Sequence, residues 1–182
     1  LQEYDAFNTT IVSKQEIENE KISTTSIRQD LINGELQKAN DALGYIYSIK
    51  GTVVQGEKRG RTIGFPTANI QPSDDYLLPR KGVYAVSIEI GTENKLYRGV
   101  ANIGVKPTFH DPNKAEVVIE VNIFDFEDNI YGERVTVNWH HFLRPEIKFD
   151  GIDPLVKQMN DDKSRAKYLL AVDFGDEVAY NI

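Results

Sequence analysis

The sequence contains no cysteine among its 182 residues. Disulfide bonds, thiolate nucleophiles and zinc or iron–sulfur sites built on cysteine are therefore excluded. No apolar run approaches the roughly 18 residues that a membrane-spanning helix needs. No basic-then-apolar signal segment opens the chain, so we expect a cytoplasmic protein with no membrane partner. Positive charge is also scarce, and the formal net charge of −7 argues against a general binder of nucleic acids or anionic membranes.

What the chain does contain is typical of a globular protein, since 40% of its residues are hydrophobic and 27% are charged. Its character changes after residue 44. Residues 1–44 are polar and mostly helical in pattern: Ser26 and Gln29 have the spacing of a capping box, Gly34 is a stop signal, and a second short helix is expected over 35–43. This stretch is too small to hold a core of its own. It either packs on the rest of the chain or is the tail of a missing domain, and the leucine at position 1 leads us to expect a fragment.

From residue 45 to residue 143 the hydrophobic side chains recur with a period of two. The sharpest case is EVVIEVNIF, residues 116–124, where one phase is entirely apolar and the other carries two glutamates and an asparagine. Short runs of this kind between turn clusters indicate an antiparallel barrel or sandwich. A last helix is expected with Asp153 as N-cap and Pro154 as first residue, and its apolar stripe is suited to covering one mouth of the barrel.

The stretch GEKRGRTIGFPTANI, residues 56–70, is the most unusual of the chain. It combines three glycines, which let a backbone approach a ligand closely, with three cations in an otherwise acidic protein: Gly56, Gly60, Gly64, Lys58, Arg59 and Arg61. These features suit phosphate binding. The loop is not a Walker A motif, because no GK[ST] follows. The alternative is a solvated hairpin loop without a ligand.

Thr67 and Asn69 lie two positions apart, so in an extended segment both side chains leave the same face. Their hydroxyl and amide oxygens could ligate a hard cation such as magnesium when substrate phosphates supply the charge. The alternative is that both residues cap a turn after Pro66.

Glu120 lies on the polar phase of its strand. It is either a solvent-facing glutamate or, on the concave face of a barrel, a general base. His140 and His141 are adjacent, and neighbouring residues of a strand point to opposite faces, so we expect surface histidines and no metal set.

Taken together, six segments resemble the riboflavin kinases found at the carboxyl end of bacterial bifunctional riboflavin kinase/FAD synthetases. They occur in the family's order and at its spacing, across about residues 46–171: GTVVQG, GRTIGFPTANI, KGVYAV, GVANIGVKPTF, VIEVNIFDFEDNIYG and FLRPEIKF. The resemblance implies a mainly β fold, a closed six-stranded antiparallel Greek-key barrel with a C-terminal helix. It also implies phosphorylation of riboflavin by ATP with Mg²⁺, to give FMN and ADP.

Carried over residue by residue, the resemblance assigns a role to eight positions. Glu120 matches the general base. The ATP-side positions are Gly56, Arg61, Thr67, Asn69 and Tyr131, of which Thr67 and Asn69 also match the magnesium ligands. Arg144 matches a flavin-side residue, and Arg165 on the last helix is a further flavin candidate from its helix position. The family pattern has histidine two residues after the glutamate, where this chain has Asn122.

The first residues carry a second resemblance. KISTTSIRQDL resembles the segment that closes the adenylyltransferase module of bacterial FAD synthetases, where Ser23, Thr24, Thr25 and Arg28 would contact a nucleotide. That module's H-x-G-H motif does not occur in this chain. We therefore expect residues 1–44 to be a remnant of that module with its linker, and residues 45–182 to be the kinase. The full-length parent would carry the missing adenylyltransferase in cis and make FAD from FMN, whereas this chain would not.

Two other function classes fit the sequence less well. A flavin- or nucleotide-binding barrel without catalysis would have no need of a base at Glu120. A nucleic-acid-binding barrel would interleave aromatic and cationic residues along its strands, whereas the cations here gather mainly in one loop.

Overall fold

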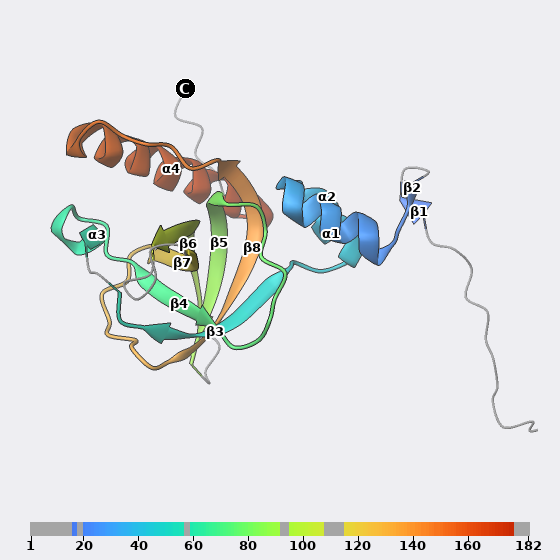
Figure 1. Ribbon diagram of the computed structural model, residues 1–182, viewed down its shortest axis with the longest axis horizontal. Coiled ribbons are helices and arrows are strands. Elements are labelled where there is room, and N and C mark those ends of the chain that lie inside the picture. The colour runs from blue at the N-terminus through green and yellow to red at the C-terminus, as the bar shows by residue number, and fades with distance from the viewer. Residues whose placement is uncertain (1–15, 18–19, 57–58, 92–94, 108–114, 177–182) are drawn as a thin grey trace, which may run out of the picture.

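A computed structural model describes residues 16–17, 20–56, 59–91, 95–107 and 115–176, and Figure 1 shows its elements. Two short strands and two helices come first, then six longer strands with a single helical turn among them, and a long last helix. In chain order they are β1 (Glu16–Ile17), β2 (Glu20–Lys21), α1 (Thr24–Asn33), α2 (Leu36–Leu43), β3 (Ser48–Val54), α3 (Arg59–Thr62), β4 (Ala68–Pro72), β5 (Gly82–Ile90), β6 (Lys95–Pro107), β7 (Ala115–Ile123), β8 (Arg134–Arg144) and α4 (Ile152–Asp173).

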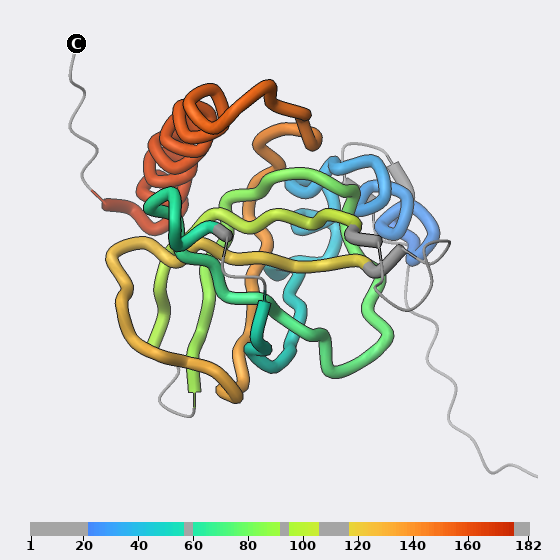
Figure 2. Tube along the Cα trace, turned by 60° about the vertical axis from the view of Figure 1, so that its left-hand side comes forward, coloured from blue at the N-terminus to red at the C-terminus, as the bar shows by residue number. Residues whose placement is uncertain are grey.

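Strands β3 to β8 close into an antiparallel barrel in the order β3-β4-β7-β6-β5-β8. The three consecutive strands β5, β6 and β7 pair as hairpins, and β8 returns to lie beside β5, which is a Greek-key arrangement. Pairing of β3 with both β4 and β8 closes the ring. The turned view of Figure 2 follows the same strands around the barrel. The predicted six-stranded Greek-key barrel is confirmed.

The inside of the barrel is filled by the apolar phase of each strand. Along β7 the inward residues are Ile119, Val121 and Ile123, each at most 8% exposed. Tyr84 and Trp139 are fully buried in the same cluster, with their rings packed edge to face at a centroid distance of 5.1 Å. Because side chains alternate along a strand, the polar phase of β7 must point outward. The barrel interior is therefore largely a packed core, although its residues Val53, Val121 and Ile123 also line a cavity.

Helix α4 packs on the outer wall of the barrel. It had been expected to cover one mouth of the barrel, and it does not. Its residues Ala166 and Leu170 are fully buried against the outward side chains of β5 and β8, which include Val83 and Ala85. Figure 1 shows the helix lying beside these strands. The helix also begins earlier than predicted, with Gly151 as its N-cap, so Asp153 lies within its first turn. None of the helices in the described residues is long and apolar enough to cross a membrane.

Helices α1 and α2 extend the barrel's own core. Leu31, Leu36 and Ala39 are nearly or completely buried and belong to the same hydrophobic cluster as the barrel interior. The buried Asn40 fixes α2 in place, because its amide donates to the carbonyl of Trp139 at 3.0 Å and its side-chain oxygen accepts from the backbone of Tyr47 at 2.8 Å. Within the described part of residues 1–44, helices α1 and α2 therefore pack on the rest of the chain.

The predicted capping box at the start of α1 is shifted by three residues. Ser23 is the N-cap, and its side chain accepts from the backbone N–H of Ser26 at 3.1 Å, while the Ser26 hydroxyl lies 3.1 Å from the backbone nitrogen of Ser23. A serine at the third helical position replaces the usual Glu or Gln. The predicted stop is confirmed, because Gly34 ends the helix in the left-handed conformation with φ 84°.

Candidate active site

A row of outward side chains crosses four neighbouring strands and forms the floor of the site. The Cα partner of Glu120 on β7 is Asn102 on β6 on one side and Asn69 on β4 on the other, and Asn102 is paired in turn with Val83 on β5. Residues paired directly across antiparallel strands point to the same face. Of the two positions considered for Glu120, the alternation excludes the concave face and places the residue on the outer face, because the interior phase of β7 is wholly apolar.

The first cavity, called here the Glu120 cavity, lies on this floor and has a volume of about 340 Å³. Its floor holds Glu120, Asn102 and Asn122, and its walls come from α4, from the connection between β8 and α4, and from the segment that follows α3. The wall residues are mostly apolar and include two aromatic rings: Ile63, Phe65, Ile147, Phe149, Leu155 and Met159. A mostly apolar cleft with a few converging polar groups is the usual form of a small-molecule site.

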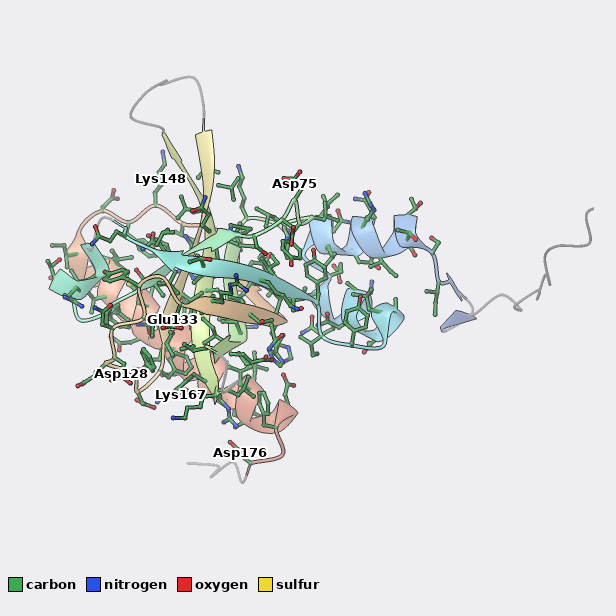
Figure 3. All side chains as sticks on the ribbon, turned by 90° about the horizontal axis from the view of Figure 1, so that it is seen from below. Asp75, Asp128, Glu133, Lys148, Lys167 and Asp176 are labelled. Atoms are coloured by element: carbon green, nitrogen blue, oxygen red, sulfur yellow. The ribbon has the colours of Figure 1, made fainter. Side chains whose placement is uncertain are left out.

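The second cavity, called here the Tyr131 cavity, has a volume of about 600 Å³. It is lined by Arg61 of α3 and by the connection between β7 and β8, which contributes Tyr131 and the acidic pair Glu127 and Asp128. Asp128 is labelled on that connection in Figure 3. Thr67 lines both cavities. The two cavities therefore adjoin at Thr67, just before β4 begins.

Two glycines let the candidate ligands Asn69 and Thr67 pack closely. A Cβ placed on Gly56 would overlap the carboxamide of Asn69, and a Cβ on Gly60 would overlap the carbonyl of Phe65 and come within 3.6 Å of the Thr67 hydroxyl. Asn69 is accordingly only 8% exposed. Gly56 and Gly60 are thus required by close approach, whereas Gly64 has space for a Cβ but a positive φ of 83°. Of its three cations, Lys58 lies outside the described residues and only the backbone of Arg59 is described, whereas Arg61 lines the Tyr131 cavity.

Arg144, predicted on the flavin side, lines the Glu120 cavity but is engaged by α4. Its guanidinium donates to both carboxylate oxygens of Asp162, from Nε at 2.9 and 3.0 Å and from Nη2 at 2.7 Å. Asp162 is 5% exposed, so the pair is nearly buried. Arg165, the further flavin candidate, donates to the carbonyl of Leu143 at 3.2 Å and is not among the residues that line either cavity.

Sequence reasoning missed Asn102 and Asp162. Asn102 lies in GVANIGVKPTF, one of the segments that carry the family resemblance, but no role was assigned to it, and only the pairing of β6 with β7 puts it beside Glu120. Asp162 is one of several polar residues on α4, and only the packing of that helix brings it to Arg144. Both placements depend on long-range contacts that a local pattern does not contain.

The two adjacent histidines differ from the prediction, since His140 is buried and both rings reach the same carboxylate. The distances to Oδ2 of Asp173 are 3.2 Å from Nδ1 of His140 and 2.8 Å from Nε2 of His141. The cause is a bulge, because β5 pairs with Trp139 and then with His141 and skips His140. His140 also lies 2.9 Å from the hydroxyl of Ser87. Burial lowers the pKa of His140 below its ordinary 6.5, against the opposing effect of the Asp173 carboxylate.

Within the described part of the chain, no group of three or more His, Asp or Glu side chains is placed to hold a metal ion. The candidate magnesium ligands are instead the neutral oxygens of Thr67 and Asn69. The Asn69 side chain rests against Gly56, where a larger residue would displace it, whereas a Cβ on Gly60 would lie at ordinary contact distance from the Thr67 hydroxyl. Hard neutral oxygens fit magnesium that is shared with substrate phosphates, because Mg²⁺ keeps few protein ligands in such sites.

Comparison with known proteins agrees with this geometry. The sequence model of the family described as riboflavin kinase matches residues 43–170. A bifunctional riboflavin kinase/FMN adenylyltransferase of Listeria monocytogenes is 48% identical over 165 residues, which are 91% of this chain and 51% of that protein. The enzyme of the same description from Bacillus subtilis is 46% identical over 157 residues, 86% of this chain and 49% of that protein. The chain thus spans about half the length of these curated relatives.

A solved structure from Streptococcus pneumoniae is 42% identical, with a TM-score of 0.79 over 86% of this chain and 50% of that one. It is described as a macrolide-efflux protein, and we take from it the fold alone. The family match covers more than half of the chain, including every strand of the barrel and both cavities. The chain belongs to the riboflavin kinase family.

Proposed function

We propose that this chain transfers the γ-phosphate of ATP to the 5′-hydroxyl of riboflavin, giving FMN and ADP. The observation that carries this proposal is that Thr67 lines both cavities, while Glu120 lines one of them. Thr67, the candidate phosphate-side ligand, therefore shares the first cavity with the Glu120 carboxylate and also lines the second cavity. Phosphoryl transfer needs this juxtaposition, because the attacking hydroxyl and the γ-phosphate must be held in line.

The linings suit the two substrates differently. The Glu120 cavity offers the apolar and aromatic walls that a flat isoalloxazine ring requires, including Phe149 and Met159. The Tyr131 cavity has Arg61 beside Thr67, where a triphosphate needs a cation, and an aromatic ring and acidic groups further along. We therefore assign riboflavin to the first cavity and ATP to the second.

In the proposed reaction the Glu120 carboxylate accepts the proton of the ribityl 5′-hydroxyl. That oxygen attacks the γ-phosphorus in line, and the bond from the γ-phosphorus to the bridging oxygen of ADP breaks. Asn102, beside Glu120 on the same face, is placed to hold the hydroxyl or the carboxylate by a hydrogen bond. Arg61 balances charge on the phosphates as ADP forms.

Thr67 and Asn69 are the residues that would hold Mg²⁺, by their hydroxyl and amide oxygens. When bound, the ion supplies neutralisation of the phosphate charge. This chain's own part is to fix the two oxygens, which the close packing of Asn69 on Gly56 favours.

The test is a chromatographic assay of the chain with riboflavin, ATP and Mg²⁺, beside Glu120→Gln. FMN without FAD is expected from the unaltered chain, and turnover should fall by roughly 10²-fold or more in the variant, with ATP binding largely kept. Glu133→Gln is the matched control, since this exposed glutamate lines neither cavity (Figure 3). Near-normal turnover of Glu120→Gln would remove that residue as the base. Absence of FMN with riboflavin still bound would favour a non-catalytic binding barrel.

The remaining parts of the proposal concern the longer protein. We infer that residues 1–44 end an adenylyltransferase module with its linker and that 45–182 form the kinase. This division rests on the sequence resemblances of the two parts. It does not rest on packing, because α1 and α2 share the barrel's core. The full-length protein would also make FAD, in keeping with the bifunctional riboflavin kinase/FMN adenylyltransferases that it resembles, and would work in the cytoplasm, where ATP is available. Formation of FAD by this chain alone would refute the remnant interpretation.

A further inference from the structure

We propose that Asn122 is a positioning residue that fixes the Pro66–Thr67 segment to the strand carrying Glu120. Its side-chain nitrogen donates to the carbonyl oxygen of Pro66 at 2.7 Å. Asn122 lies two positions after Glu120 on β7, on the same outward face, and both line the Glu120 cavity with Thr67. The bond thus joins the phosphate-side segment to the base-bearing strand at the point where the cavities adjoin.

The need for such a bond follows from the pairing of β4 with β7. The backbone ladder between them runs from Ile70 to Ala68, where Ala68 is opposite Val121, and the strand assignment of β4 begins there. Proline has no N–H, so Pro66 cannot donate to a continued ladder. The Asn122 amide meets the Pro66 carbonyl just beyond this end, and so extends the attachment of the chain toward Thr67.

The segment before Pro66 contains backbone hydrogen bonds of its own. The backbone N–H groups of Ile63 and Phe65 both donate to the carbonyl of Gly60, at 3.2 and 2.8 Å. These bonds shape the turn but do not tie it to β7. The Asn122 bond does so, which is why loss of this one donor is expected to loosen Thr67 relative to Glu120.

The donor property of Asn122 can be separated from its size. Asn122→Leu keeps the shape and removes the donor, whereas Asn122→His restores a ring N–H near the same place. Asn160→Leu is the matched control, because that asparagine also donates to a backbone carbonyl, of Val156 at 2.9 Å, but lines neither cavity.

Two measurements test the proposal, of which the kinetic one rests on the proposed function and the other does not. Backbone hydrogen exchange of a peptide covering residues 59–67, in the chain without substrates, should be roughly 5- to 10-fold faster in Asn122→Leu, the value of one lost hydrogen bond. In steady-state assays kcat should fall about 10- to 100-fold. This loss should exceed any loss of riboflavin affinity, because the bond from Asn122 holds the Thr67 segment even though its side chain also lines the riboflavin cavity.

Recovery of both quantities in Asn122→His, with no change in Asn160→Leu, is the expected pattern. Unaltered exchange in Asn122→Leu would overturn the anchoring, and so would unaltered kcat in a chain that makes FMN. A variant that loses riboflavin affinity as much as kcat would show general damage and equally overturn the positioning role. If the unaltered chain makes no FMN, the proposed function fails, and hydrogen exchange alone decides for or against the anchor.

Discussion

The buried ion pair between Arg144 and Asp162 is expected to be a main attachment of α4 to the barrel. The two side chains are 16% and 7% exposed, and the pair is bidentate. Asp162 also accepts from Gln158 at 3.0 Å, and the guanidinium donates to the carbonyl of Pro145 at 3.0 Å and lies 5.8 Å from the ring centre of Phe149. Truncating Asp162 would leave the Arg144 charge nearly buried without its carboxylate partner.

Removal of one partner from a buried pair costs about 3–5 kcal/mol. Asp162→Ala should fall near the lower value, about 3 kcal/mol, because Arg144 keeps the Pro145 carbonyl and some solvent contact. For a chain of this size that corresponds to a melting temperature lower by roughly 6–12 °C. Replacing both residues by apolar ones, Arg144→Met with Asp162→Leu, should recover most of the loss, because no charge is then left buried.

Equilibrium unfolding in urea, followed by fluorescence of the single, buried Trp139, measures both variants. A loss below about 1 kcal/mol for Asp162→Ala, the range of an exposed pair, would refute the reasoning. So would a double variant no more stable than the single one. Arg144→Lys separates geometry from charge, since lysine cannot make the bidentate contact.

Three further predictions concern the site and its surroundings. Thr67→Ala should weaken Mg²⁺-dependent binding of a non-hydrolysable ATP analogue in calorimetry, while Thr67→Ser, which keeps the hydroxyl, should not; equal affinities would remove Thr67 as a ligand. Gly56→Ala should displace the Asn69 carboxamide, because the added methyl overlaps it, and the same titration should show at least about tenfold weaker nucleotide binding, a cost of roughly 1.4 kcal/mol. The lowered pKa of His140 means that the unfolded chain binds more protons below about pH 6.5, so stability should fall as pH drops through this range. His140→Gln should flatten that part of the unfolding profile even though Asp173 remains, and an unchanged slope would contradict the assignment.

The strands of the barrel were predictable from the sequence because their signals are local, whereas the choice of a closed six-stranded barrel over a sandwich came from the family resemblance. The alternation in EVVIEVNIF predicts which side chains of β7 are buried, and the structure agrees for Ile119, Val121 and Ile123, whereas Val117 of the same phase is 41% exposed. The same alternation separates Glu120 from them. The face on which Glu120 emerges was left open between two alternatives, because a period of two does not tell the inner from the outer face until the apolar phase is assigned to the core.

The parts that sequence could not supply depend on pairing across the chain. Asn102 meets Glu120 through the register of β6 and β7, and Arg144 meets Asp162 through the packing of α4. The bulge at His140 is a further case, since it changes which way a ring points and leaves no mark in the alternation. Each of these placements is decided by tertiary contacts between segments that local patterning treats separately.

The outward row through Glu120 also bears on how reliably the site forms. If β7 slipped by one residue against β6, Glu120 and Asn122 would enter the apolar interior, and Ile119 and Val121 would face the cavity. An unpaired carboxylate in such a core is strongly disfavoured. The burial of apolar side chains that closes the barrel therefore also places Glu120, the proposed base, on the face that carries the cavity. A chain that has folded into this barrel consequently has Glu120 in the position that the proposed reaction needs.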